Sequence, residues 1–315
     1  MRPSFTYGPV PSRRLGFSLG VDLLPFKTCS MDCVYCQLGP NRRTTVRRRE
    51  HAPARAVLAE IRAALASGRR IDAVTFSGSG EPTLHAGLGR IIRAIKRQTT
   101  VPVVVLTNSS TLSRPEVRLA LAAADIVIPS LDAATESVLR RVNRPHPSLT
   151  AARIIDGLAA FRRRFKGQIW LEILLVKGIN DGPAHLRALR RAIARLAPDR
   201  VQLNTVVRPP AEPWAKPLSR PELERIKASF GGTAEIVAEP PEGGRSAPAA
   251  GGLEGRVLGL LRRRPETAEG LAVSLEAEIG AVRSAVRTLS ASGRIKPAAH
   301  GRRRYYEVVK DAAAG

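Results

Sequence analysis

Short apolar runs alternate with longer amphipathic stretches over the first 230 residues of the chain. Runs of Val, Ile and Leu that are too short for helices predict strands, whereas apolar residues spaced three and four apart, as in Ala54–Ser67 and Leu84–Arg97, predict helices. We expect six strands, at Gly20–Leu24, Ala73–Ser77, Val101–Thr107, Ile126–Leu131, Ile169–Val176 and Val201–Val206. The pattern therefore indicates an α/β protein.

The connections between these strands are long enough for the crossovers that parallel strands require. A partial (β/α)6 TIM-like barrel over residues 1–230 is the fold class that this rhythm favours. In such a fold, functional side chains lie at the carboxyl ends of the strands. Polar residues that follow the predicted strands are therefore the first candidates for a site.

A second, smaller domain is expected after a linker. Residues 231–252 are rich in Gly, Pro, Ala and Ser, and only Ala234–Ala238 resembles a strand. Residues 253–315 then show three helical patterns, at Leu253–Arg263, Thr267–Leu275 and Ile279–Ser292, and a hairpin with a basic turn at Ala298–Arg304. This order is similar to a winged helix-turn-helix domain, in which the third helix and the wing would contact nucleic acid through Arg283, Arg287, Arg302, Arg303 and Arg304.

The charge and composition of the chain do not decide what kind of partner it binds. The 315 residues include 51 Lys and Arg against 27 Asp and Glu, a formal charge of +24. Such a charge attracts phosphate-rich partners, although a compositional bias toward Arg and Ala would produce it too. The amino-terminal residues lack the apolar core of a secretory signal, and no apolar run is long enough to span a membrane, so we expect a cytoplasmic protein without membrane contact.

All three cysteines of the chain, Cys29, Cys33 and Cys36, lie within eight residues. An odd number of crowded cysteines does not fit disulfide pairing, but it fits metal ligation. Three thiolates on one loop can hold three irons of a cubane cluster and leave the fourth iron open for a ligand. A zinc site is the alternative, and its fourth ligand would have to come from elsewhere, with His51 the nearest histidine.

The spacing of these cysteines, with Tyr35 before the last of them, resembles the signature of the radical S-adenosylmethionine (SAM) superfamily. The resemblance implies one 4Fe-4S cluster on the three cysteines, SAM as the second cofactor, and a reductant such as flavodoxin or ferredoxin. It also implies reductive cleavage of SAM to a 5′-deoxyadenosyl radical that abstracts hydrogen from a substrate. Tyr7–Gly39 is similar to an uncharacterised bacterial subgroup related to the tRNA wyosine synthases. The chain lacks the cysteines for the second cluster of those synthases, which argues against the same reaction.

Several polar and small residues are candidate contacts for SAM. The segment Ser77–Pro82 resembles the superfamily's Gly-Gly-Glu motif, which implies a role in binding the SAM amino group for Gly80, with Glu81 in support, and includes Gly78 among the cofactor-binding residues. The resemblance adds Tyr35 to the cofactor-binding residues. At the ends of the next two predicted strands, Asn108, Ser130 and Asp132 are able to bond a ribose or a carboxylate, although such residues commonly serve as caps or turn residues.

Three functions follow as hypotheses. The first is a radical SAM enzyme that modifies a tRNA or another RNA, with the C-terminal domain holding the substrate. The second is radical modification of a peptide or protein gripped by that domain. The third is a regulator whose cluster controls DNA binding without turnover. The Gly80-Glu81 segment favours an enzyme, because a sensor needs no site for the SAM amine.

Overall fold

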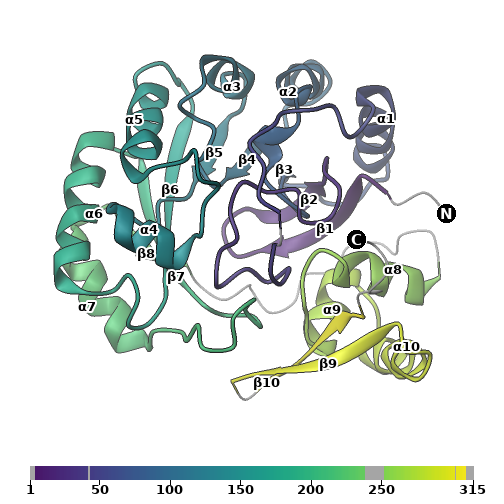
Figure 1. Ribbon diagram of the computed structural model, residues 1–315. Coiled ribbons are helices and arrows are strands. Elements are labelled where there is room, and N and C mark those ends of the chain that lie inside the picture. The colour runs from purple at the N-terminus through teal and green to yellow at the C-terminus, as the bar shows by residue number, and fades with distance from the viewer. Residues whose placement is uncertain (1–3, 42, 238–251, 302, 310–315) are drawn as a thin grey trace.

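The computed structural model describes residues 4–41, 43–237, 252–301 and 303–309. An eight-stranded sheet follows chain order from β1 to β8 and curves so that its helices cover the outer face (Figure 1). Its strands are β1 (Thr6–Ser12), β2 (Gly16–Val21), β3 (Ala73–Phe76), β4 (Val103–Thr107), β5 (Ile126–Pro129), β6 (Gln168–Leu175), β7 (Arg200–Thr205) and β8 (Ala234–Ile236). Every neighbouring pair from β2 to β8 is parallel.

The six expected strands correspond to β2–β7, and the partial barrel is confirmed. Two further strands extend the sheet beyond these six. β1 forms an antiparallel hairpin with β2, which begins four residues before the predicted Gly20. β8, in the segment expected to be linker, pairs with β7, so the sheet continues past residue 230.

Helices on the outer face bury one apolar stripe each against the sheet. They are α1 (Ala54–Leu65), α2 (Leu88–Lys96), α3 (Pro115–Leu121), α5 (Ala151–Arg162), α6 (Pro183–Leu196) and α7 (Arg220–Phe230). The short helix α4 (Glu136–Val142) lies instead at the carboxyl ends of the strands, where the backbone oxygen of Val142 accepts the N–H of Val34. A 3-10 turn, η1 (Pro82–Leu84), occupies the start of the helix that was expected from Leu84. The main core lies between these helices and the sheet, where Ile91, Phe76 and Leu171 are fully buried. No helix among the described residues is long and apolar enough to cross a membrane.

The C-terminal unit contains three helices and a hairpin, in the order that the sequence indicates. These are α8 (Leu253–Leu261), α9 (Ala268–Leu275), α10 (Ile279–Ala291), β9 (Ile295–His300) and β10 (Arg303–Val308). Most of the stretch expected to be a basic turn is strand, because β9 and β10 pair in register from Arg303–His300 onward. Arg302 and the rest of the expected linker, residues 238–251, lie outside the described residues.

The C-terminal unit packs against β1, beside the carboxyl ends of the strands (Figure 1). Val10 of β1 is buried in the small core formed by α8, α9 and α10. His300 and Tyr305 bond the backbone oxygens of Val206 and Val207, which follow β7, at 3.0 Å each. The hairpin therefore joins the barrel on the side where a site is expected.

Candidate active site

The cysteine loop follows β2 and is tied to two neighbouring segments. The backbone N–H of Lys27 donates to the oxygen of Ser79 at 2.6 Å, and that of Glu81 donates to the oxygen of Thr28 at 3.0 Å. The N–H of Val34 donates to Val142 at the end of α4, at 3.0 Å. These bonds fix the loop at the carboxyl ends of the strands, where its three cysteines are free and half-buried.

Each cysteine sulfur accepts a hydrogen bond from a different donor. Asn108 Nδ2 lies 3.4 Å from Cys29 Sγ, Asn143 Nδ2 lies 3.4 Å from Cys33 Sγ, and Lys27 Nζ lies 3.2 Å from Cys36 Sγ. Such donors stabilise negative charge on thiolates, the form in which cysteine binds iron. Sequence reasoning missed Lys27 and Asn143, although Lys27 lies only two residues before Cys29.

Burial opposes ionisation of two of these thiols when no metal is bound. It raises the pKa of Cys29 to about 12, with a further contribution from the Glu81 carboxylate. The pKa of Cys33 is likewise raised well above its usual value, first by burial and then by Cys29. A bound metal replaces these protons, because its positive charge stabilises the thiolates.

The donor set fits an iron–sulfur cubane. Among the described residues, no three His, Cys, Asp or Glu side chains are arranged to hold a single metal ion. A cubane is bound differently, with one thiolate on each iron. The three free thiols on one short loop, each with its own hydrogen-bond donor, provide that kind of site.

The segment Ser77–Pro82 follows β3 and lies against the cysteine loop. Gly78 has φ 137°, and a Cβ atom there would meet Cγ of Asp22 at 2.5 Å. A Cβ on Gly80 would lie 2.0 Å from the backbone oxygen of Thr28. Both positions therefore require glycine, for conformation and for close approach respectively.

Asp22, at the end of β2, holds this segment. Its Oδ1 accepts the backbone N–H of Ser79 at 3.1 Å, and its Oδ2 accepts the Ser79 hydroxyl at 2.6 Å. Asp22 was not among the residues expected at the site. It is one of the few carboxylates that are buried in the barrel, at 7% exposure.

Glu81 is buried, and both of its carboxylate oxygens bond groups of the protein. Oε1 accepts the hydroxyls of Thr83 at 2.5 Å and Thr107 at 2.6 Å, and Oε2 accepts the backbone N–H of Asn108 at 2.6 Å. Burial raises its pKa, while these bonds act in the opposite direction. Glu81 thus ties the loop after β3 to the loop after β4.

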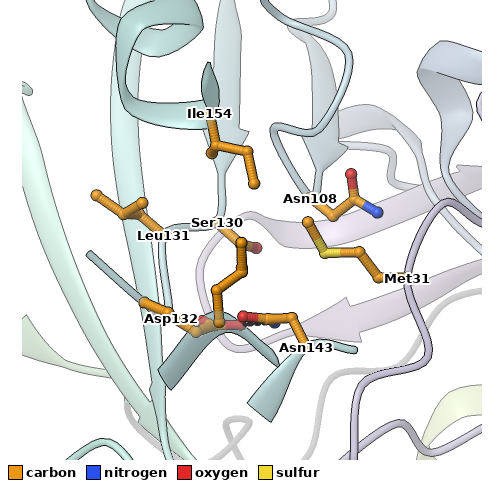
Figure 2. Close-up of a pocket in the computed structure, with 9 residues that line it drawn as sticks. Met31, Asn108, Ser130, Leu131, Asp132, Asn143 and Ile154 are labelled. Carbon is orange, nitrogen blue, oxygen red and sulfur yellow. Dashed lines mark hydrogen bonds between the residues drawn. The ribbon is translucent and has the colours of Figure 1, made fainter. Parts of the chain in front are cut away.

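A small pocket beside the cysteine loop brings together three of the expected polar residues (Figure 2). Asn108, Ser130 and Asp132 line it from the ends of β4 and β5, and Met31 lines it from the cysteine loop. Ile154 of α5 contributes an apolar wall. Residues separated by about a hundred positions in the sequence therefore meet at one edge of the sheet, as the strand-end argument predicts.

Asp132 connects the pocket to the cysteines. Its Oδ2 accepts hydrogen bonds from the Tyr35 hydroxyl and from Asn143 Nδ2, and its Oδ1 accepts the N–H of Leu174 at 2.9 Å. Burial raises the pKa of Asp132 to about 6 against the effect of these bonds. Asn143 also faces Cys33, so one amide bridges the carboxylate and the sulfur. The hydroxyl of Tyr35 is directed at Asp132.

A family model for the radical SAM superfamily matches residues 23–189, which is more than half of the chain. The chain belongs to the radical SAM superfamily. The match includes the cysteine loop, the segment after β3, and the pocket residues. The chain is therefore a radical SAM enzyme.

Several relatives place this radical SAM chain among known proteins. A UPF0026 protein of Methanocaldococcus jannaschii is 35% identical over 229 residues, covering 72% of this chain and 71% of that protein. A Brachyspira hyodysenteriae protein named GTPase Obg is 37% identical over 294 residues, covering 92% of this chain. The chain spans only 43% of that relative's length.

Two further similarities are weaker in sequence. The dual-specificity RNA methyltransferase RlmN of Sorangium cellulosum is 28% identical over 216 residues, covering 64% of this radical SAM chain and 51% of that protein. The structure of native anSMEcpe with bound AdoMet superposes with a TM-score of 0.50 at 13% identity, covering 68% of this chain and 59% of that one. The structural likeness supports the shared fold.

Proposed function

We propose that Cys29, Cys33 and Cys36 bind three irons of a 4Fe-4S cluster whose fourth iron binds SAM. The observation that carries this assignment is the contact of each cysteine sulfur with its own donor, beside a polar pocket at the strand ends. When bound, the cluster supplies one electron that splits a carbon–sulfur bond of SAM, giving methionine and a 5′-deoxyadenosyl radical. A hydrogen atom taken from the substrate completes 5′-deoxyadenosine.

The protein's own groups have separate tasks in this proposal. The backbone at Gly78 and Gly80 approaches the SAM amino group, and Glu81 holds that segment through its bonds to Thr107 and Asn108. Asn108, Ser130 and Asp132 present polar atoms to the rest of SAM from the pocket. Tyr35 acts through Asp132, to which its hydroxyl donates.

Anaerobic reconstitution with iron and sulfide, followed by reduction with SAM, tests the proposal. We expect 5′-deoxyadenosine by mass spectrometry from the wild type, and neither cluster nor product from Cys33→Ala. A matched control is Ser67→Ala, at an exposed position after α1. Product formation by Cys33→Ala, or a wild-type cluster that never cleaves SAM with any substrate tested, would contradict it.

We further propose that the substrate is RNA. The similarity to an RNA methyltransferase, the formal charge of +24 and the helical C-terminal unit support this assignment. In that unit, which we propose is a winged helix, Arg283 and Arg287 are exposed on α10, and Arg283 is paired with Glu269 at 3.1 Å. Arg287 is therefore the stronger candidate for a phosphate contact. A cytoplasmic location with a flavodoxin or ferredoxin as reductant suits such a substrate.

Binding of a tRNA mixture at several salt concentrations tests the RNA assignment. We expect affinity that falls with salt and a smaller salt dependence for Arg287→Gln, because one phosphate contact is lost. Arg62→Gln, at an exposed position of α1, is the control. Absence of salt-dependent RNA binding would favour the peptide substrate, whereas DNA affinity that follows the cluster's redox state would favour a regulator.

A further inference from the structure

The inner face of the sheet changes from apolar to polar toward the carboxyl ends of its strands. Near the amino ends, a separate apolar cluster contains Ala73, Val104, Ile128 and Trp170, one residue from each of β3–β6, and Leu15 packs against it. None of its members belongs to the core under the helices. Side chains two residues farther along a strand point to the same side. On β6 and β7 these side chains are polar. Glu172 lies two residues after Trp170 on β6, and it is paired in the sheet with Gln202 on β7.

Two arginines from the turn between β1 and β2 reach this polar layer. Arg14 forms an ion pair with Glu172, and its Nη1 donates to Gln202 Oε1 at 3.0 Å. Arg13 Nη1 donates to Asn204 Oδ1 at 3.2 Å. Arg13 has no carboxylate within 4.0 Å among the residues that the structure describes, so its guanidinium contacts only a neutral amide oxygen there.

Two more arginines, one after β7 and one from the C-terminal unit, lie near this polar layer. Arg208 follows β7, and Arg264 follows α8 in the C-terminal unit; both contact Glu266 Oε2, at 3.3 and 3.2 Å. Their side chains are 18% and 17% exposed. The Nε of Arg208 is buried and has no hydrogen-bond partner among the residues that the structure describes. A buried donor without a partner destabilises the fold, and a ligand oxygen would satisfy it.

The four guanidinium groups outnumber the carboxylates that contact them. Glu172 pairs with Arg14, and Glu266 is shared by Arg208 and Arg264, so two negative charges face four positive ones. The pKa of Arg13 is lowered to about 10 by burial, and then by repulsion from Arg208 and Arg14. Holding uncompensated charge away from water destabilises a fold, which indicates a place that an anion completes.

We propose that Arg13, together with Arg14 and Arg208, binds an oxyanion of the substrate, a phosphate or a carboxylate, at the polar inner face of the sheet. This rests on the proposed function, because the inner face holds substrate only if the radical forms at the neighbouring strand ends. It deepens that function by naming the chemical group that is recognised. Phosphate and carboxylate share the planar, bidentate mode of binding that guanidinium favours.

Anion-dependent stabilisation of the reconstituted full-length enzyme tests this site. Inorganic phosphate and malonate are titrated separately at constant ionic strength, and both the thermal midpoint and the binding heat are measured. We expect saturable binding of at least one anion, weakened tenfold or more in Arg13→Gln. The stronger of the two identifies whether the substrate group is a phosphate or a carboxylate.

The stability of the free variant separates a binding role from a structural one. Since Arg13 has cationic neighbours and no ion pair in the described structure, Arg13→Gln without anion should melt at the wild-type temperature or above it. Arg208→Gln should also weaken anion binding, and Arg62→Gln, exposed on α1, should not. Equal anion binding by wild type and Arg13→Gln, or no saturable binding at all, overturns the site.

The same protein distinguishes this failure from failure of the proposed function. SAM affinity is measured in parallel, and it should stay within twofold of the wild type in Arg13→Gln. If anion binding depends on Arg13 while no 5′-deoxyadenosine forms, the anion site stands and the radical function fails. If 5′-deoxyadenosine forms but Arg13→Gln binds the anion as the wild type does, the radical function stands and the anion site fails.

Discussion

Arg263 of the C-terminal unit forms an ion pair with Asp22, the carboxylate that holds the segment after β3, with Nε 3.3 Å from Oδ2. The two side chains are 11% and 7% exposed. Arg263 also lies over the ring of Tyr7, 4.8 Å from its centroid, and Tyr7 bonds Ser77 at 2.8 Å. One C-terminal side chain therefore contacts both supports of the proposed SAM segment.

Replacing Arg263 with Met should weaken SAM binding about tenfold, which corresponds to about 1.4 kcal/mol. The reason is that Asp22 would keep a buried charge without its partner and would hold Ser79 less firmly. We expect a higher KM for SAM with kcat nearly unchanged at saturating SAM, measured by 5′-deoxyadenosine formation. Arg262→Met, at the exposed neighbouring position, is the control. An unchanged KM in Arg263→Met would show that the contact does not position the segment.

Gly80→Ala should disrupt the contact between the segment after β3 and the cysteine loop. The new Cβ would lie 2.0 Å from the backbone oxygen of Thr28, so the two backbones must separate, at a cost of about 1–3 kcal/mol. The midpoint temperature of thermal unfolding and the iron content after reconstitution should both fall. Gly182→Ala is the matched control, because Gly182 has nothing within 4 Å of its ideal Cβ and precedes α6 with φ −70°. Wild-type iron content in Gly80→Ala would contradict the close approach.

Lys27→Met should lower the reduction potential of the cluster. A cation and hydrogen-bond donor beside a coordinating sulfur stabilises the more negative, reduced cluster, and Lys27 Nζ lies 3.2 Å from Cys36 Sγ. A redox titration followed by electron paramagnetic resonance measures the change. Lys166→Met, at an exposed position after α5, should leave the potential unaltered. An unchanged or higher potential in Lys27→Met would mean that the lysine leaves the sulfur when iron binds.

The sequence predicted six strands of the barrel because their apolar runs are continuous, but it missed β1. Gly8, Pro9 and Pro11 interrupt the apolar pattern of that segment, and prolines argue against a central strand. β1 lies at the edge of the sheet, where missing N–H groups are tolerated. β8 falls within Ala234–Ala238, which the sequence marked as strand-like, but a segment of three paired residues inside a Gly- and Pro-rich stretch was assigned to the linker.

The sequence likewise predicted some residues of the candidate site and missed others. The three cysteines were predicted because they share one short motif, and Asn108, Ser130 and Asp132 because they end predicted strands. Asp22 and Arg263 were missed, since they act through a contact between positions 241 residues apart. Nothing local marks such a pair, and only the packing of α8 against β1 brings it together.

A pH-dependent prediction concerns Glu222, which caps α7. Its carboxylate accepts the N–H and hydroxyl of Ser219 at 2.7 and 2.6 Å, and it pairs with Lys177 at 2.9 Å. These contacts, those of Ser219 first, lower its pKa from 4.5 to about 2. A lowered carboxyl pKa means that the folded state holds the proton less tightly than the unfolded state. Glu222 therefore stabilises the fold fully above pH 4.5, and this contribution is lost as the pH falls toward 2.

Glu222→Gln should remove that dependence. We expect the variant to melt below the wild type at pH 7, and the difference between the two melting temperatures to shrink as the pH falls from 4.5 toward 2. Circular dichroism across this range measures the midpoints. Glu224→Gln is the matched control, because Glu224 lies on the same helix and pairs with Arg220 and Lys227 but caps no backbone N–H. A constant difference between wild type and Glu222→Gln over the whole range would show that the carboxylate charge does not carry the stabilisation, and that only the shape of the cap does.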